Sequence, residues 1–428
     1  MLKRFSSKHF QDSSVKKNFF LNVFDGSIYS FAMSFVSMQT VLPVFVKKIS
    51  GSDIAVGLIP VIWSIGFNFP QIFVSNYVRQ IGFKKLWVLK TALVQRIPWL
   101  VLALLSYFLI ETVSNNTALI IFFLGLAFAA LGGSINLPGW FDLISKLTPV
   151  QLRGRLFAYR SVLGGALGIF GGWLVSKILA EIIFPQNFAL LFLIAFLITM
   201  ASYSFLVFLK EEKPNHPEQT FSSKEFLKRL GSIVKKEKNY RNFLIADSLM
   251  MMALMSHAFF AVNAFDKFSL TDSYAGYFTI VMMLSMVIGS LYFGYLADKL
   301  GHKINLLWGI IFTFIACLFA LISPSVEIYY LCFAGSSLTI SLTLVSRLTI
   351  ISEICLEEDR PTYISLTNLI TAPFILSGLL GGWIANQFGY DIVFIIAGIF
   401  ALASAIWFLI MVEEPRKKNL ELIKPSIN

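Results

Sequence analysis

Three charged side chains interrupt long apolar segments and are the first candidates for chemistry. Asp25 and Asp247 come early in their segments, and Arg96 lies about 15 Å from the nearer end of its segment at a rise of 1.5 Å per residue. If these segments cross a membrane, an ionisable group at the centre costs about 2.5–3.5 kcal/mol on insertion, so each is a functional candidate. A guanidinium suits a carboxylate or phosphate, and a carboxylate can bind a proton or a cation. The alternatives are an internal ion pair or a backbone-carbonyl partner for Arg96 and, for Asp25, a helix-start acid paired with a lysine.

A second group of candidates is polar and uncharged at neutral pH. His257 lies in the middle of an apolar segment, and a histidine changes its charge in the pH range that a proton-driven carrier uses. A neutral structural histidine fits equally well. Neutral amides inside such segments form hydrogen bonds between helices more often than they bind ligands. The amides considered as binding candidates are Gln39, Asn136 and Asn263.

The segments that hold these residues are long enough to span a lipid bilayer. The chain has 428 residues, of which 57% are hydrophobic and 14% charged, and it contains 43 phenylalanines. A spanning helix needs about 20 mostly apolar residues. Such windows recur twelve times, which predicts an all-α polytopic membrane protein. The expected spans are 18–46, 54–77, 86–110, 117–140, 156–183, 187–209, 241–266, 274–297, 303–323, 327–353, 361–387 and 391–412.

The basic residues that produce the net charge of +11 are distributed according to the expected membrane topology. Basic residues cluster at the N-terminus, in alternate loops and in the C-terminal tail, while the other loops hold few. This alternation follows the positive-inside rule and argues against nucleic-acid binding. With an even number of spans, we expect both termini in the cytoplasm and the chain in a plasma membrane of the bacterial inner-membrane type.

The chain is expected to consist of two related halves. Residues 1–210 and 241–428 would each form a six-helix bundle, joined by a linker, 211–240, that carries an amphipathic helix. The sequence Gly171-Gly172-Trp173 recurs as Gly381-Gly382-Trp383, and Glu211-Glu212 recurs as Glu413-Glu414. Duplicated halves are how many secondary transporters build a central binding site.

One loop carries a compact charged motif between the expected eighth and ninth spans. Its glycines permit a tight turn, and its basic residues favour the cytoplasmic side. The motif residues are Gly294, Asp298, Lys299, Gly301 and Lys303. The pattern resembles the loop motif of the major facilitator superfamily. The resemblance implies twelve helices in two pseudo-symmetric bundles, and a gate in which Asp298 meets the N-terminus of the eleventh span near Pro361.

The sequence departs from that pattern in the first half. Arg79 stands where the family usually keeps its acid, and the fifth span has no proline that would complete the drug-antiporter signature. Further charges at the inner ends of the spans could form a latch of weak, reversible ion pairs, of which each contributes about 0–1 kcal/mol. The latch candidates are Asp142, Arg153, Arg155, Glu353 and Arg360. Arg160 is expected among these edge charges.

The resemblance implies a secondary active transporter that moves a small organic solute by alternating access, with proton coupling as a further hypothesis. Arg96 favours an anionic or zwitterionic solute, and the many aromatic residues favour a lipophilic one. A non-transporting receptor or assembly partner with the same fold is the alternative. The sequence contains no nucleotide-binding or hydrolase motif, so we expect neither an enzyme nor a cofactor. The three cysteines lack metal-like spacing, no metal site is expected, and the protein is expected to be a monomer in membrane lipid.

Overall fold

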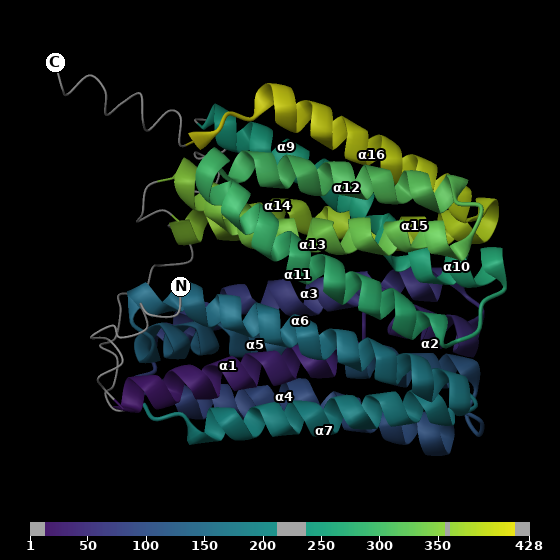
Figure 1. Ribbon diagram of the computed structural model, residues 1–428, viewed down its shortest axis with the longest axis horizontal. Helices are drawn as coiled ribbons and strands as arrows, with labels where there is room; N and C mark the ends of the chain where they lie inside the picture. Colours follow the sequence, from purple (N-terminus) through teal and green to yellow (C-terminus); the bar gives the residue numbers. More distant parts are fainter. Residues whose placement is uncertain (1–12, 212–236, 356–359, 416–428) are drawn as a thin grey trace. The chain divides into compact units, whose positions relative to one another are not determined.

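A computed structural model of the protein describes residues 13–211, 237–355 and 360–415. Every regular element among these residues is helical. The expected amphipathic helix of the linker lies outside the described residues. The prediction of an all-α protein is confirmed, and the helices follow the twelve expected spans closely (Figure 1).

Nine of the spans are continuous helices or a helix with one short extension. They are α3 (Asp53–Gln80), α4 (Lys84–Leu104) with the π-helical η3 (Leu105–Leu109), α5 (Asn115–Leu147), α6 (Val150–Glu181), α7 (Gln186–Phe208), α11 (Tyr274–Leu300), α12 (His302–Ile322), α13 (Val326–Ile354) and α16 (Tyr390–Met411). Eleven spans among the described residues are long and apolar enough to cross a membrane. The remaining one is the first, which is interrupted between its two helices.

Three spans are interrupted. The first consists of α1 (Ser13–Ser34) and α2 (Val41–Ser50), and the seventh of α9 (Lys238–Ala253), the 3₁₀ turn η4 (Leu254–Ala258) and α10 (Phe260–Phe268). The eleventh divides into α14 (Arg360–Ile375) and α15 (Ser377–Phe388), and the break at Leu376 comes three residues after Pro373.

The described chain separates into two compact units. Unit 1 comprises residues 1–50, 62–220 and 272–280, and unit 2 comprises residues 51–61, 221–271 and 281–428. The beginning of α3 therefore groups with unit 2, and the beginning of α11 with unit 1. The division into halves at 1–210 and 241–428 stays a prediction, since the contact-based units exchange these two short segments.

Each unit is a bundle of helices packed side by side. In unit 1, α1 packs against α6 and α7, and α4 packs against α5 and α7. In unit 2, α12 packs against α13 and α16, and α9 packs against α14 and α16 (Figure 1). Aromatic side chains fill much of the interior, as Phe45 does between Phe122, Phe188 and Phe192. Many large apolar side chains remain on the outside, as expected where lipid is the solvent.

Glutamates that follow the last helix of each expected half cap a helix elsewhere in the same unit. The carboxylate of Glu211 accepts the backbone N–H groups of Lys84 and Lys85 at 3.1 and 2.8 Å, at the start of α4. The carboxylate of Glu414 accepts the N–H of Lys303 at 3.0 Å, at the start of α12. The first N–H groups of a helix have no partner within the helix and carry partial positive charge, so a carboxylate there stabilises the helix. One glutamate of each repeated Glu-Glu pair, Glu211 and Glu414, thus has a structural role.

The turn between α11 and α12 depends on Gly301. This residue has φ of +94°, a backbone conformation that side chains disfavour, and a Cβ atom there would overlap the Glu414 carboxylate. Gly294, about two helical turns earlier in α11, has no neighbouring atom within 4 Å of the place a Cβ would occupy. The two glycines of the motif therefore have different roles.

Replacing Gly301 by alanine should lower the free energy of unfolding by about 1–2 kcal/mol, because the left-handed conformation penalises a Cβ atom. The cap on α12 should weaken as well. The measurement is the thermal unfolding midpoint of the purified protein in detergent. Gly294→Ala is the matched control and should be neutral or slightly stabilising, since alanine favours a helix. Equal effects of the two substitutions would contradict this account of the turn.

Candidate functional site

A cavity in unit 1 gathers several of the residues that the sequence singled out. Its volume is about 350 Å³, and all of its lining residues belong to unit 1. They come from α1, α3, α4, α5, α6 and α7: Asp25, Tyr29, Met33, Trp63, Phe67, Gln95, Arg96, Gly133, Asn136, Leu137, Trp140, Arg160 and Leu206. The structure thus brings together Asp25, Arg96 and Asn136 of the predicted candidates.

Asp25 lies at the centre of a polar network in this cavity. Its side chain is buried, and Oδ1 accepts a hydrogen bond of 2.7 Å from the Ser202 hydroxyl of α7. Its Oδ2 lies 3.5 Å from Nη1 of Arg160 in α6. The structure therefore does not show the alternative in which Asp25 is an acid at the start of a helix paired with a lysine. The partner of Asp25 is an arginine on another helix.

Arg160 was expected at the edge of the membrane, and the structure places it in the cavity wall. Its Nη1 donates to the backbone oxygen of Asn22 at 2.8 Å and to the side-chain oxygen of Asn22 at 2.6 Å. Its guanidinium carbon lies 4.8 Å from the centre of the Trp140 ring. The sequence contains a signal for this arrangement. Arg160 and Asp25 each lie a few residues after the start of their expected spans, so the two side chains could lie at similar depths in the membrane. Only the packing of α1 against α6 shows that the two side chains meet.

Arg96 is buried and bonded mainly to neutral groups. Nε donates to the Thr199 carbonyl at 2.9 Å, and Nη1 donates to the Ala92 carbonyl at 3.0 Å. Nη2 lies 3.4 Å from the Ser202 hydroxyl. The rings of Tyr29 and Tyr203 each lie 5.6 Å from its guanidinium carbon. The backbone-carbonyl partners that the sequence left open as an alternative are thus present, and the positive charge of Arg96 remains beside the cavity.

The neutral amide candidates are placed differently. Asn136 lines the cavity and donates to the Val88 carbonyl at 2.9 Å. Asn263 donates to the Tyr329 hydroxyl at 2.8 Å in unit 2, a bond between α10 and α13. Gln39 is half-buried in the break between α1 and α2. Asn136 is the amide positioned to contact a ligand in the unit 1 cavity.

Unit 2 has its own buried ion pair, formed by Asp247 and an arginine that the sequence analysis did not single out. Nε and Nη2 of Arg347 donate to the Asp247 carboxylate at distances of 2.7–3.1 Å. The other donors of Arg347 reach Asn368 at 3.1 Å and Thr371 at 3.3 Å. Every donor-bearing nitrogen of Arg347 therefore has a partner, which indicates an internal clamp between α9, α13 and α14. The signal available in the sequence was the position of Arg347 within the expected tenth span, 327–353.

His257 lies apart from that ion pair. It belongs to the η4 turn, is buried, and its ring centre lies 5.6 Å from that of Phe260. Its role as a coupling group stays a prediction.

The loop motif and the latch candidates are described only in part. Lys299 is exposed, with its ammonium 4.6 Å from the Tyr295 ring centre, and Lys303 Nζ donates to the Leu409 carbonyl at 3.1 Å. The side chains of Asp298, Pro361 and Arg360 lie outside the described residues, so the gate contact of Asp298 stays a prediction.

Among the latch candidates, Asp142 lies 3.5 Å from Lys84 Nζ, within unit 1. Arg153 donates to the carbonyls of Ser145 and Thr148 at 2.6 and 3.1 Å. Arg155 is exposed, and Glu353 is half-buried near the end of α13. A latch between the two halves stays a prediction.

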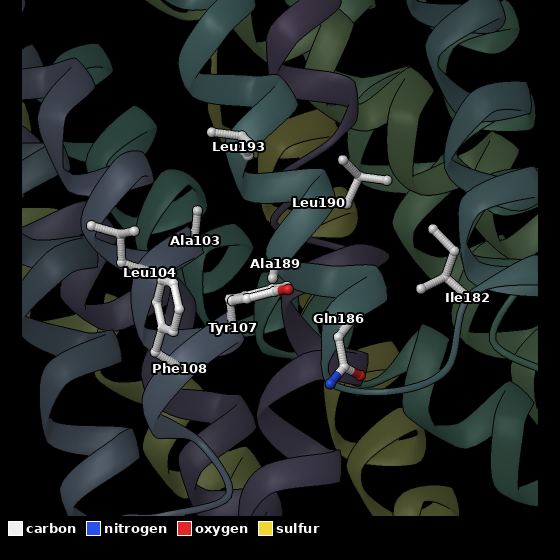
Figure 2. Close-up of a pocket in the computed structure, with 9 residues that line it drawn as sticks. All are labelled: Ala103, Leu104, Tyr107, Phe108, Ile182, Gln186, Ala189, Leu190 and Leu193. Atoms are coloured by element: carbon white, nitrogen blue, oxygen red, sulfur yellow. The ribbon is translucent and has the colours of Figure 1, made fainter.

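A second cavity, of about 410 Å³, opens between α4 with η3 and α7. Figure 2 shows Leu104, Tyr107 and Phe108 on one side and Leu190 and Leu193 on the other. The exposed fractions of Tyr107 and Phe108 are 59% and 63%. Its lining is almost wholly apolar and offers no charged group to a polar solute.

The comparisons with known proteins identify the family. The sequence profile of the Major Facilitator Superfamily matches residues 28–267 and 243–426. The chain belongs to the Major Facilitator Superfamily. It is therefore a multi-pass membrane protein with the fold of a membrane transporter. A search of curated proteins found no match.

Solved structures agree on the fold. The chain is similar to a mutant of the nucleoside transporter NupG, with a TM-score of 0.68 and 13% identity over 93% of this chain and 100% of that one. A D-xylose–proton symporter gives a TM-score of 0.68 and 13% identity over 94% and 99%. A bacterial homologue of the iron transporter ferroportin gives 0.67 and 15% over 92% and 98%. At these identities the similarity establishes the fold, while the cargo of this superfamily member has to be inferred from its own cavity.

Breaking the Asp247–Arg347 pair should strongly destabilise unit 2. Either Asp247→Asn or Arg347→Gln leaves one buried charge without compensation, which costs about 3–5 kcal/mol. The double variant removes both charges and should regain a large part of that loss. A double-mutant cycle of thermal unfolding in detergent measures the coupling. If the stability lost in the double variant equals the sum of the losses in the two single variants, the two side chains do not interact.

Proposed function

We propose that this superfamily member is a secondary active transporter that moves a small organic solute across the membrane by alternating access. The observation that carries the proposal is the unit 1 cavity, which is lined by six different helices, five of which contribute charged or aromatic side chains. Spanning helices expose polar groups to a shared cavity where a solute or ion must pass, because such groups are costly in lipid. The volume of about 350 Å³ lies within the range of small-molecule sites, roughly 300–1,000 Å³.

The proposal includes the orientation and the state of the protein in the membrane. Both termini face the cytoplasm of a bacterial-type inner membrane, in agreement with the distribution of basic residues. The protein acts as a monomer and catalyses no chemical reaction. The cavity is lined by side chains of α1 and α3 to α7, and we expect movement of these helices to open it to each side in turn.

Alternating access predicts that a cysteine in the cavity can be labelled from both sides of the membrane. Leu137→Cys places a thiol in the lining, in a background with the native cysteines at 317, 332 and 355 replaced by serine. A membrane-impermeant thiol reagent should modify it in right-side-out and in inside-out vesicles. Leu197→Cys is the control, since Leu197 is 55% exposed on the outer face of α7, where lipid should exclude the reagent. Labelling from one side alone would contradict alternating access and favour a non-transporting receptor.

We further propose that protons drive the transport, with Asp25 as the group that takes up the proton. Its carboxylate shares the cavity wall with Arg160 and bonds to Ser202, so a change in its protonation alters the charge of the binding site directly. His257 is the competing candidate, in unit 2.

Proton coupling predicts acidification or alkalinisation of proteoliposomes when a transported solute is added, followed with a trapped pH-sensitive dye. Asp25→Asn should abolish the proton flux, while His257→Gln should retain most of it. The reverse pattern would assign the proton to His257. Solute uptake without proton movement would contradict coupling and leave a facilitator or a carrier driven by another ion.

A further inference from the structure

We propose that the unit 1 cavity binds small organic monoanions with a flat apolar body, such as aromatic carboxylates and sulfonates, and that Arg160 is the residue that contacts the anionic group. This inference rests on the proposed transport function, because it names the class of solute for the same cavity. It is carried by the charges of the lining, the bonding of its two arginines, and the shape of the site around Gly26.

The ionised lining residues leave one positive charge in excess. Arg96 and Arg160 are cations, and Asp25 is the one carboxylate among the residues that line the cavity. All three lie together in a region from which solvent is largely withdrawn, since Asp25 and Arg96 expose 4% and 3% of their surfaces. Uncompensated charge in such surroundings is costly, and a ligand with a single negative charge removes the imbalance.

Hydrogen bonding separates the roles of the two arginines. Each nitrogen of the Arg96 guanidinium has a protein acceptor, which holds its side chain against α4 and α7. Arg160 directs only Nη1 to protein acceptors, namely Asn22 and Asp25. Within the described part of the chain, Nε and Nη2 of Arg160 form no hydrogen bond. This edge of a guanidinium is the one that binds an oxyanion with two parallel hydrogen bonds.

Gly26 makes room for the guanidinium. A Cβ atom on Gly26 would overlap Nε, the guanidinium carbon and Nη2 of Arg160, so the side chain lies directly against the backbone of α1. The Trp140 ring lies 4.8 Å from the guanidinium carbon. The glycine and the tryptophan together hold the arginine in one orientation, which reduces the entropy lost when a ligand binds.

The remaining walls fit an apolar, planar body. Trp63 and Phe67 stack with ring centres 6.1 Å apart and an interplanar angle of 10°, and both line the cavity with Met33 and Leu137. Aromatic rings favour stacked or edge-to-face contact with another ring. A doubly charged phosphate would exceed the single positive charge of the lining, so the charge balance favours a carboxylate or sulfonate.

The test compares benzoate with benzamide, which has a similar shape and no charge, by calorimetry and thermal shift on the purified protein. Benzoate should bind at least about tenfold more tightly, because its carboxylate accepts charge-assisted hydrogen bonds from Arg160 that the neutral amide of benzamide cannot match. Arg160→Gln should abolish this preference. Gly26→Ala should weaken it too, because the added methyl group displaces the guanidinium while its charge is retained.

Lys177→Gln is the matched control. Lys177 is an exposed cation on the same helix, α6, and its loss should leave the preference for benzoate unchanged. A circular-dichroism spectrum and a thermal midpoint for every variant exclude misfolding as the cause of lost binding. Equal binding of benzoate and benzamide, no binding of either, or an Arg160→Gln variant that still prefers benzoate would each overturn the inference.

Uptake of benzenesulfonate into proteoliposomes separates this inference from the transport proposal. A sulfonate stays ionised and crosses lipid slowly, so uptake reports the protein. Arg160-dependent binding of benzoate without uptake of benzenesulfonate would support the anion site and refute transport. Uptake of neutral solutes that is insensitive to Arg160→Gln would support transport and overturn the anion site.

Discussion

A charge inside a membrane-spanning bundle is stable only where protein groups replace the water that it loses. Arg96 meets this requirement with backbone carbonyls and a hydroxyl, and Arg347 meets it with a carboxylate, an amide and a hydroxyl. Arg160 meets it only partly, through Asn22 and Asp25. The same physical requirement therefore produces two cations whose guanidinium nitrogens all have partners, and one cation, Arg160, that uses only Nη1 for hydrogen bonds within the described residues. The partners of Arg96 and Arg160 belong to α1, α4 and α7, so the packing of these helices with α6 determines which groups the two arginines reach.

The ends of the helices obey a related rule. Backbone N–H groups at the start of α4 and α12 need acceptors, and Glu211 and Glu414 supply them from the chain segments that follow α7 and α16. Lys146 also lies 2.7 Å from the Glu211 carboxylate, so one acid joins α4, α5 and the end of α7. Contacts of this kind fix one end of each bundle while leaving the cavity residues further along the helices independent of it.

The two acids that match in the repeated sequence have different partners in the folded chain. Asp25 meets an arginine of α6, whereas Asp247 meets an arginine of α13. The first pair lines a cavity and is 3.5 Å long, while the second is bonded through several atoms at 2.7–3.1 Å. These geometries fit the proposed binding site in unit 1 and a structural ion pair in unit 2, because a bidentate clamp has no donor left for a solute.

The sequence by itself determined the membrane class, the approximate bounds of the twelve spans and the superfamily, because hydrophobic length, loop charge and the Gly294–Lys303 motif are local properties of the chain. It also indicated Asp25, Arg96 and Asn136 as candidates, since polar groups in an apolar span stand out whatever their surroundings. Tertiary structure alone decided that Arg160 belongs in the cavity, that Arg96 is held by carbonyls, and that Arg347 clamps Asp247. Those assignments depend on how each helix is rotated about its axis and which helices touch, and both follow from packing between residues a hundred or more positions apart in the chain.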